Sequence, residues 1–159
     1  MKIDKAVATH VRVPFVEPFR ISSGCVAEKD AIVLELYSDG LTGYGESSAM
    51  AGSFYSADTP EKSWNELCEI VLPAIVGREF ECPKNWNFAL DSLRVGNFTK
   101  AGVETAFWDL AAQMRNEPLH VALGDAANKW NPDLLWAFTM KFPICWGPSS
   151  AIWPMAIAG

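Results

Sequence analysis

The chain has 159 residues, of which 50% are hydrophobic and 20% charged, and its formal net charge is −6. This composition is typical of a folded globular protein and excludes both a disordered chain and a membrane bundle. Binding to nucleic acid is excluded as well, because it would need a basic surface. The length is that of one domain with a sizeable core.

The first residues carry no apolar stretch of the kind that opens a signal peptide, so we expect a cytoplasmic protein. The four cysteines lie too far apart in sequence for a thiolate metal site or a C-x-x-C redox pair. In that compartment they are expected to be reduced and partly buried. They are Cys25, Cys68, Cys82 and Cys145.

The chain begins with features of β-strands. A first strand is expected to end at Pro14, and a run rich in turn and polar residues follows over 17–24. Apolar and polar residues alternate over 32–37, which predicts a half-buried strand. Asp39-Gly40 predicts a two-residue hairpin turn, because glycine accepts the positive φ that such a turn requires.

The return strand is expected over residues 41–46. Gly43 and Gly45 in this strand predict either a bulge or a close approach of another backbone. Together the three strands form an antiparallel meander.

Helices are predicted after the strands. Thr59 is suited to the N-cap and Pro60 to the first helical position, with Pro73 kinking or ending this helix. A shorter helix is expected from Pro83, and a long one over 99–115. Pro118 is expected to open a last helical turn that stops at Gly124. The apolar stripes of the first two helices are Trp64, Leu67, Val71 and Ile75, then Trp86, Leu90 and Leu93.

These elements predict an α+β fold: a three-stranded antiparallel β-meander followed by a helical bundle. Residues 129–159 differ from the rest. They hold only three charged residues but four of the seven tryptophans, and no helical or strand periodicity persists through them. Prolines at 143, 148 and 154 exclude a membrane helix there.

Catalytic motifs do not emerge from spacing alone. The two histidines, His10 and His120, are expected to be surface or half-buried residues, since a metal site needs three or four convergent ligands. Glu104 and Asp109 are five residues apart on the long helix and therefore point about 140° away from each other. We interpret both as packing and capping residues.

Two segments, 18–24 and 47–58, mix glycine and serine with apolar side chains. Such segments suit a lid over a small-molecule pocket, and they suit equally well a loop that tucks into the protein's own core.

The chain from Lys2 to Gly124 resembles the N-terminal capping domain of the enolase superfamily, in its muconate-lactonizing subgroup. The residues that carry the resemblance stand in order along the chain. They are Val13-Pro14 with Pro18-Phe19, Gly43-Tyr44-Gly45-Glu46, Phe54-Tyr55-Ser56, the run of residues 100–113, and Pro118-Leu119 with Leu123-Gly124. Within the superfamily, Met50 with Phe54-Tyr55-Ser56 is most similar to o-succinylbenzoate synthases and N-acylamino acid racemases, with dipeptide epimerases as the neighbouring possibility.

The resemblance implies that residues 1–124 close over a small carboxylate substrate, while a separate (β/α)₈ barrel abstracts the α-proton. In such enzymes Mg²⁺ stabilises the negative charge that develops on the substrate. The resemblance implies substrate contacts from two loops of this chain and no catalytic or metal-binding residue in it. The contacting residues are Phe19, Ile21, Ser22, Ser23, Met50, Ser53, Phe54 and Tyr55.

Past Gly124 the sequence has no K-x-K pair, and residues 129–159 hold a single acid, Asp133. Our hypothesis is that residues 125–159 are a poorly ordered, off-frame tail in place of the barrel, joined near 125–130, and that the chain is inactive alone. The alternative is a stand-alone binding module that docks on a separate barrel subunit or another partner. In either case we expect self-association, because a capping domain without its barrel exposes apolar surface.

Overall fold

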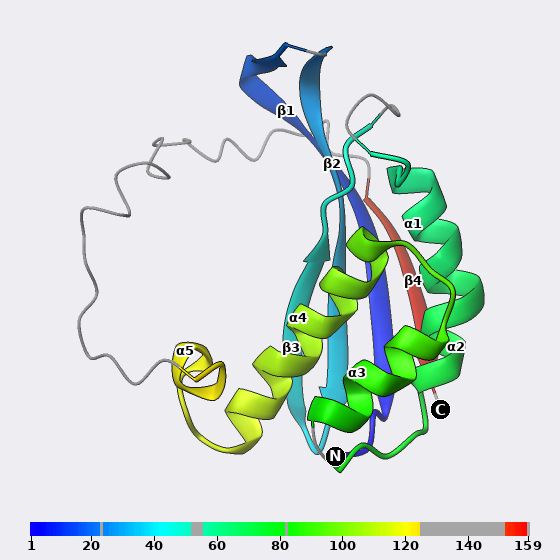
Figure 1. Ribbon diagram of the computed structural model, residues 1–159, viewed down its shortest axis with the longest axis vertical. Helices are drawn as coiled ribbons and strands as arrows, with labels where there is room; N and C mark the ends of the chain where they lie inside the picture. The colour runs from blue at the N-terminus through cyan, green and yellow to red at the C-terminus, as the bar shows by residue number, and fades with distance from the viewer. Residues whose placement is uncertain (23, 52–55, 82, 125–151, 159) are drawn as a thin grey trace.

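The computed structural model describes residues 1–22, 24–51, 56–81, 83–124 and 152–158. It shows one antiparallel sheet with helices against one face (Figure 1). The strand order is β3-β2-β1-β4. The strands span β1 Lys5–Ile21, β2 Gly24–Ser38, β3 Leu41–Ser47 and β4 Ile152–Ala158. The predicted α+β meander with helices following it is confirmed.

The first hairpin is longer than the sequence pattern predicted. β1 passes through Pro14 and continues to Ile21, so the strand end expected at Pro14 and the loop expected over 17–24 are wrong. The ladder with β2 shifts register between Pro14 and Phe19. Proline fits at this interruption because it has no N–H to give to a continuous ladder.

The second hairpin turns as predicted. Asp39 and Gly40 have φ of 50° and 78°, the left-handed values that a two-residue turn needs between right-twisted strands. β3 returns along β2, with Leu41 opposite Ser38 and Ser47 opposite Ile32.

A continuous helical segment follows, made of α1 (Pro60–Glu66), a π-helical turn (Leu67–Val71) and α2 (Leu72–Ile75). The predicted N-cap is confirmed, because the Thr59 hydroxyl accepts a hydrogen bond from the Lys62 amide at 3.2 Å. The π-helical turn ends two residues before Pro73. Proline has no N–H and cannot donate the backbone hydrogen bond that a regular helix needs at this position. The helix ends two residues after this proline.

The remaining helices are α3 (Pro83–Ser92), α4 (Asn97–Met114) and α5 (Leu119–Ala122), each within two residues of its predicted position. The described core lies between the sheet and the helical segment 60–75, α3 and α4, and is built from residues between Ile3 and Ala111. At its centre, Trp86 stacks on Phe107 with ring centroids 4.1 Å apart, and Phe80 meets both rings edge-on.

The close backbone approach predicted at Gly43 and Gly45 is confirmed. The long helix α4 lies directly on β3, and no side chain separates the two backbones at these glycines. Glu104 and Asp109 have the packing role expected of them, but not the capping role, because both stand inside α4 and not at its ends. Glu104 accepts a bond from the indole of Trp108, and Asp109 accepts one from the backbone amide of Tyr44 at 2.9 Å.

The C-terminal segment adds a fourth strand that no sequence pattern predicted. β4 lies antiparallel to β1 along the edge opposite β3. Residues 125–151 lie outside the described residues, so the hypothesis about the origin and order of the tail stays a prediction.

Candidate functional site

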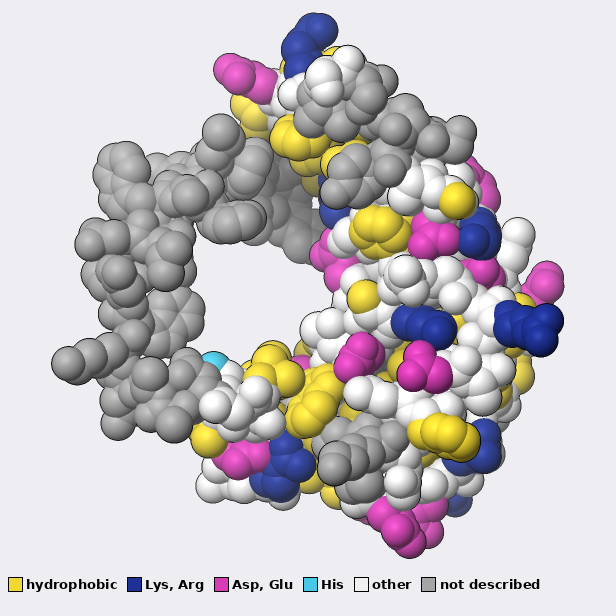
Figure 2. Space-filling view, viewed as in Figure 1, with side chains coloured by type: hydrophobic (Ala, Val, Ile, Leu, Met, Phe, Trp, Pro, Cys, Tyr) yellow, Lys and Arg dark blue, Asp and Glu magenta, His cyan; other side chains and the backbone are white. Residues whose placement is uncertain are grey.

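The two predicted substrate-contacting segments project from the same end of the sheet. β1 and β3 run in one direction and β2 in the other, so the tip of the β1–β2 hairpin and the segment after β3 meet at one end (Figure 1). Hydrophobic surface is visible over this hairpin (Figure 2). Val16 is 70% exposed and Phe19 is 48% exposed.

A pocket of about 470 Å³ lies between these segments. Phe19 from the hairpin and Met50 from the segment after β3 both line it, so the structure brings one residue of each predicted loop to the same cavity. The other lining residues are four apolar ones, Phe15, Val26, Ala49 and Ala51, and four polar ones, Glu28, Lys29, Asp30 and Ser48.

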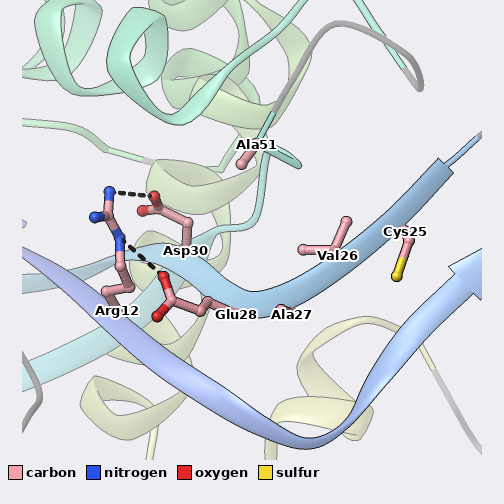
Figure 3. Close-up of a pocket in the computed structure, with 7 residues that line it drawn as sticks. All are labelled: Arg12, Cys25, Val26, Ala27, Glu28, Asp30 and Ala51. Atoms are coloured by element: carbon pink, nitrogen blue, oxygen red, sulfur yellow. Dashed lines mark hydrogen bonds and ion pairs between the residues drawn. The ribbon is translucent and has the colours of Figure 1, made fainter.

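A second pocket of about 360 Å³ adjoins the first and shares Val26, Glu28, Asp30 and Ala51 with it. Its remaining lining residues are Arg12, Cys25 and Ala27. Figure 3 shows the Arg12 guanidinium between two carboxylates of β2. Arg12 lies 3.1 Å from an oxygen of Asp30 and 3.8 Å from one of Glu28. Cys25 is exposed, so the expectation of partly buried cysteines is wrong at this position.

Asp30 is the buried charge at the base of the hairpin. Its side chain is 5% exposed and is paired with Arg12 and with the imidazole of His10. Arg12 and Asp30 face each other because they are register partners of β1 and β2. A buried carboxylate is tolerated only when such partners replace its lost hydration. His10 also stacks on Trp64, at 5.7 Å between ring centroids, and is the satisfied histidine that was expected.

The start of the second segment is held by another carboxylate, Glu46. Lys29 lies 3.1 Å from one of its oxygens, and the Ser48 hydroxyl donates to the same oxygen. Partial burial acts to raise the pKa of Glu46, but the Ser48 hydrogen bond and the Lys29 ammonium outweigh burial and lower it. The ionised Glu46 thus anchors Lys29 and Ser48, two residues that line the pocket.

The far end of the second segment is held by Asp58. Its carboxylate accepts a hydrogen bond from Lys62 at 2.7 Å and one from the backbone amide of Phe98 at 3.4 Å. The Lys62 bond, together with the amides at the start of α4, lowers the pKa of Asp58 although burial opposes this. Glu66 completes the arrangement by accepting from the Gly96 amide at 2.9 Å and the Thr99 hydroxyl at 2.6 Å. Two carboxylates from elsewhere in the chain thus cap α4.

We expect Asp58→Asn to lower the free energy of unfolding at neutral pH by about 1 kcal/mol, the usual net value of a charged helix cap. Because the folded pKa of Asp58 lies below its unfolded value, the wild-type advantage is complete above the unfolded pKa of about 4. It disappears as the pH falls through the folded pKa. Urea denaturation of both proteins between pH 2 and pH 7 measures this difference. A pH-independent gap would contradict the assignment.

The predicted contact residues divide into three groups. Phe19 and Met50 meet at the pocket. Ser22 is exposed in the hairpin turn and Ile21 ends β1, so these two belong to a hairpin and not to a flexible loop. Ser23, Ser53, Phe54 and Tyr55 lie outside the described residues. Substrate contact by all eight stays a prediction.

Sequence reasoning missed Phe15 and Val26, which line the pocket beside Phe19 and Met50. A signal existed for Val26. It is separated from the buried Ile32 and Leu34 by an even number of positions along β2, and such residues lie on the same face of a sheet, here the face that packs against the helices. Arg12 gave no signal, because its pairing with Asp30 depends on the register of the two strands.

The described residues do not assemble a metal centre: within the ranges given above, no three His, Cys, Asp or Glu side chains gather closely enough to hold an ion. In the same part of the chain, no helix has the length and apolar character needed to cross a membrane.

Comparison with known families decides the relationship. Residues 3–124 match the family model described as mandelate racemase / muconate lactonizing enzyme, N-terminal domain. The chain belongs to this family.

This N-terminal domain is 31% identical over 127 residues to the o-succinylbenzoate synthase of Geobacillus stearothermophilus, covering 79% of this chain and 34% of that protein. It is 31% identical over 124 residues to the N-succinylamino acid racemase of Thermus thermophilus, covering 78% and 34%. The chain thus spans about a third of the length of the curated relatives it matches.

Solved structures agree with the fold. An enolase superfamily member from Listeria innocua superposes with a TM-score of 0.75 at 29% identity, over 80% of this chain and 34% of that one. The L-Ala-D/L-Glu epimerase of Bacillus subtilis gives a TM-score of 0.71 at 27% identity, over 78% and 34%. The N-terminal domain therefore has the capping-domain fold of the enolase superfamily.

Proposed function

We propose that residues 1–124 form the capping domain of an enzyme that abstracts a proton α to a carboxylate, and that this domain contributes the specificity wall of the substrate site. The observation that carries the proposal is the shared pocket of Phe19 and Met50, built from the two segments that the family resemblance implicates. The proposed substrates are those of the o-succinylbenzoate synthase and N-acylamino acid racemase class.

The chemistry of the pocket supports this division of labour. Its wall is mainly apolar, and the carboxylates around it are paired with cations: Asp30 with Arg12, and Glu46 with Lys29. An apolar wall binds the apolar part of a ligand, because removing apolar surface from water is favourable. The carboxylate end of the substrate would then be held by the barrel.

Magnesium belongs to the same proposal. When bound, Mg²⁺ supplies charge stabilisation for the developing enolate. The described residues do not fit such a site, since they gather no suitable group of ligands. In this proposal both the lysine bases and the metal ligands belong to the barrel, and this chain carries out no reaction step.

The alternative is that the chain acts as a separate module that docks on a barrel subunit. The intact match through residue 124 favours this reading, because the whole capping domain is present to dock. Docking would also cover the exposed hydrophobic side chains of the hairpin, such as Val16. Without that cover, we expect the chain to self-associate.

A reconstitution assay tests the proposed function. The purified chain with Mg²⁺ is expected to give no turnover of N-succinylamino acids or of the o-succinylbenzoate precursor. The chain is then mixed with the Geobacillus stearothermophilus synthase lacking its N-terminal third. Turnover is expected to be at least about tenfold higher than the turnover of that barrel alone, because the capping domain completes the site and excludes water from it.

Matched variants make the assay specific. Phe19→Ala and Met50→Ala are expected to weaken the rescue mainly through KM, since both residues line the pocket. Phe88→Ala, at a residue 79% exposed on α3, is expected to rescue as well as the wild type. Turnover by the purified chain alone would contradict the placement of the catalytic groups. Failure of rescue over a wide concentration range would argue against docking.

A further inference from the structure

The two edges of the sheet are covered in different ways. At the β3 edge, side chains of α4 bind the outward backbone groups: Asp109 accepts from the Tyr44 amide, and the Gln113 amide donates to the Thr42 carbonyl at 2.8 Å. At the opposite edge, residues 5–11 of β1 pair with the C-terminal segment as β4 (Figure 1). One edge is closed by a helix, the other by an added strand.

Residues 5–11 of β1 are paired on both sides over the same seven positions. Lys5 stands opposite Tyr37 of β2 and Ala158 of β4, and Val11 opposite Ala31 and Ile152. Without β4 these seven positions would present a continuous row of unpaired backbone groups, which is a template for another strand.

The strand that occupies this edge is β4, an uncharged segment. Its seven residues, Ile152–Ala158, carry no charge and include Pro154, which has no N–H to donate and is typical of an edge strand. Strand addition of this kind is stabilised chiefly by backbone hydrogen bonds, so it tolerates different side chains. The described core is formed by residues 3–111, far from β4 in sequence.

We propose that residues 5–11 of β1 are a strand-acceptor site, which binds an extended, uncharged segment of about seven residues by β-addition. In this chain the C-terminal segment is its tethered ligand. The tether keeps the local concentration of that segment high, so an added peptide binds only when the tethered strand is broken. This inference does not depend on the proposed function.

The test uses the full-length chain with Met155→Pro and Ala156→Pro together. Successive amides of a strand point to opposite edges, so one of the two prolines removes a bond to β1 whichever way the strand faces. Ser149→Pro with Ser150→Pro, placed before β4, is the matched control. Hydrogen exchange of residues 5–11 is the readout, with the amides of α4 reporting that the fold is intact.

In the Met155→Pro/Ala156→Pro variant, every second amide over residues 5–11 is expected to exchange at least about tenfold faster, because only alternate amides point to β4. The amides that point to β2 are expected to stay protected. A peptide of residues 150–159, added at about 100 μM, restores protection to the variant, and the same peptide with both prolines does not. In the wild-type chain, the added peptide is expected to leave the exchange of residues 5–11 unchanged.

Four results would overturn the proposal, and three of them concern residues 5–11: alternate amides that stay protected in the variant, no rescue by the peptide at about 1 mM, or protection that returns only as the variant dimerises. The last would make a second copy the occupant. A chain ending at residue 151 repeats the test without prolines. If α4 loses protection in both proteins, β4 is part of the cooperative fold and not a replaceable strand, which also overturns the proposal.

Discussion

Replacing Gly45 by alanine is expected to destroy the cooperative fold. An added Cβ would lie 2.1 Å from the carbonyl oxygen of Gly102 and 2.7 Å from the amide nitrogen of Ala106, both backbone atoms of α4. Neither atom can move aside without moving the helix off the sheet. Overpacking usually costs 1–3 kcal/mol, and a clash with rigid backbone exceeds this range, so we expect a loss of at least about 3 kcal/mol.

Urea denaturation followed by circular dichroism measures the change. Gly40→Asn is the matched control: this glycine has a φ of 78° but nothing within 4 Å of an added Cβ, and asparagine tolerates the left-handed region. We expect the control to lose less than about 1 kcal/mol. Equal losses at the two positions would contradict the clash with the α4 backbone as the cause, because Gly45 has no positive φ that would require glycine.

Trp86→Ala is expected to have a comparable effect through a different cause. Trp86 is fully buried and stacks on Phe107, while Phe80 packs edge-on against both rings. Truncation to alanine removes the centre of this aromatic cluster and leaves a cavity between α3 and α4. Such substitutions cost about 3–5 kcal/mol.

The same helix offers a control for this prediction. Phe88 lies two residues further along α3 and is 79% exposed, so Phe88→Ala removes an aromatic ring without opening a cavity. We expect its free energy of unfolding to change by less than about 0.5 kcal/mol. If Trp86→Ala unfolds at nearly the wild-type urea concentration, the cluster does not stabilise the domain as described.

Much of the local structure could be predicted because its causes are local. The alternation over residues 32–37, the Asp39-Gly40 turn and the Thr59 cap each depend on neighbours within a few positions. The hairpin before them could not be predicted to its full length. Pro14 is an ordinary strand-ending signal, and only the register shift beside it explains why the strand continues.

The candidate site was predictable only in part. The resemblance directed attention to Phe19 and Met50, and the structure brings both to one pocket. The anchoring carboxylates carried no comparable signal. Asp58 accepts a hydrogen bond from a backbone amide 40 positions away in sequence, and Glu66 accepts one from an amide 30 positions away. No sequence periodicity predicts such pairs.

The sequence by itself determined the class of fold, the order of its elements and the family to which residues 3–124 belong. Those features follow from periodicity, turn chemistry and motif order, which are properties of short stretches of chain. The tertiary structure alone decided the pocket, the capping of α4 and the pairing of β4 with β1. Each of these joins residues distant in sequence, and strand register and helix packing set which of them meet.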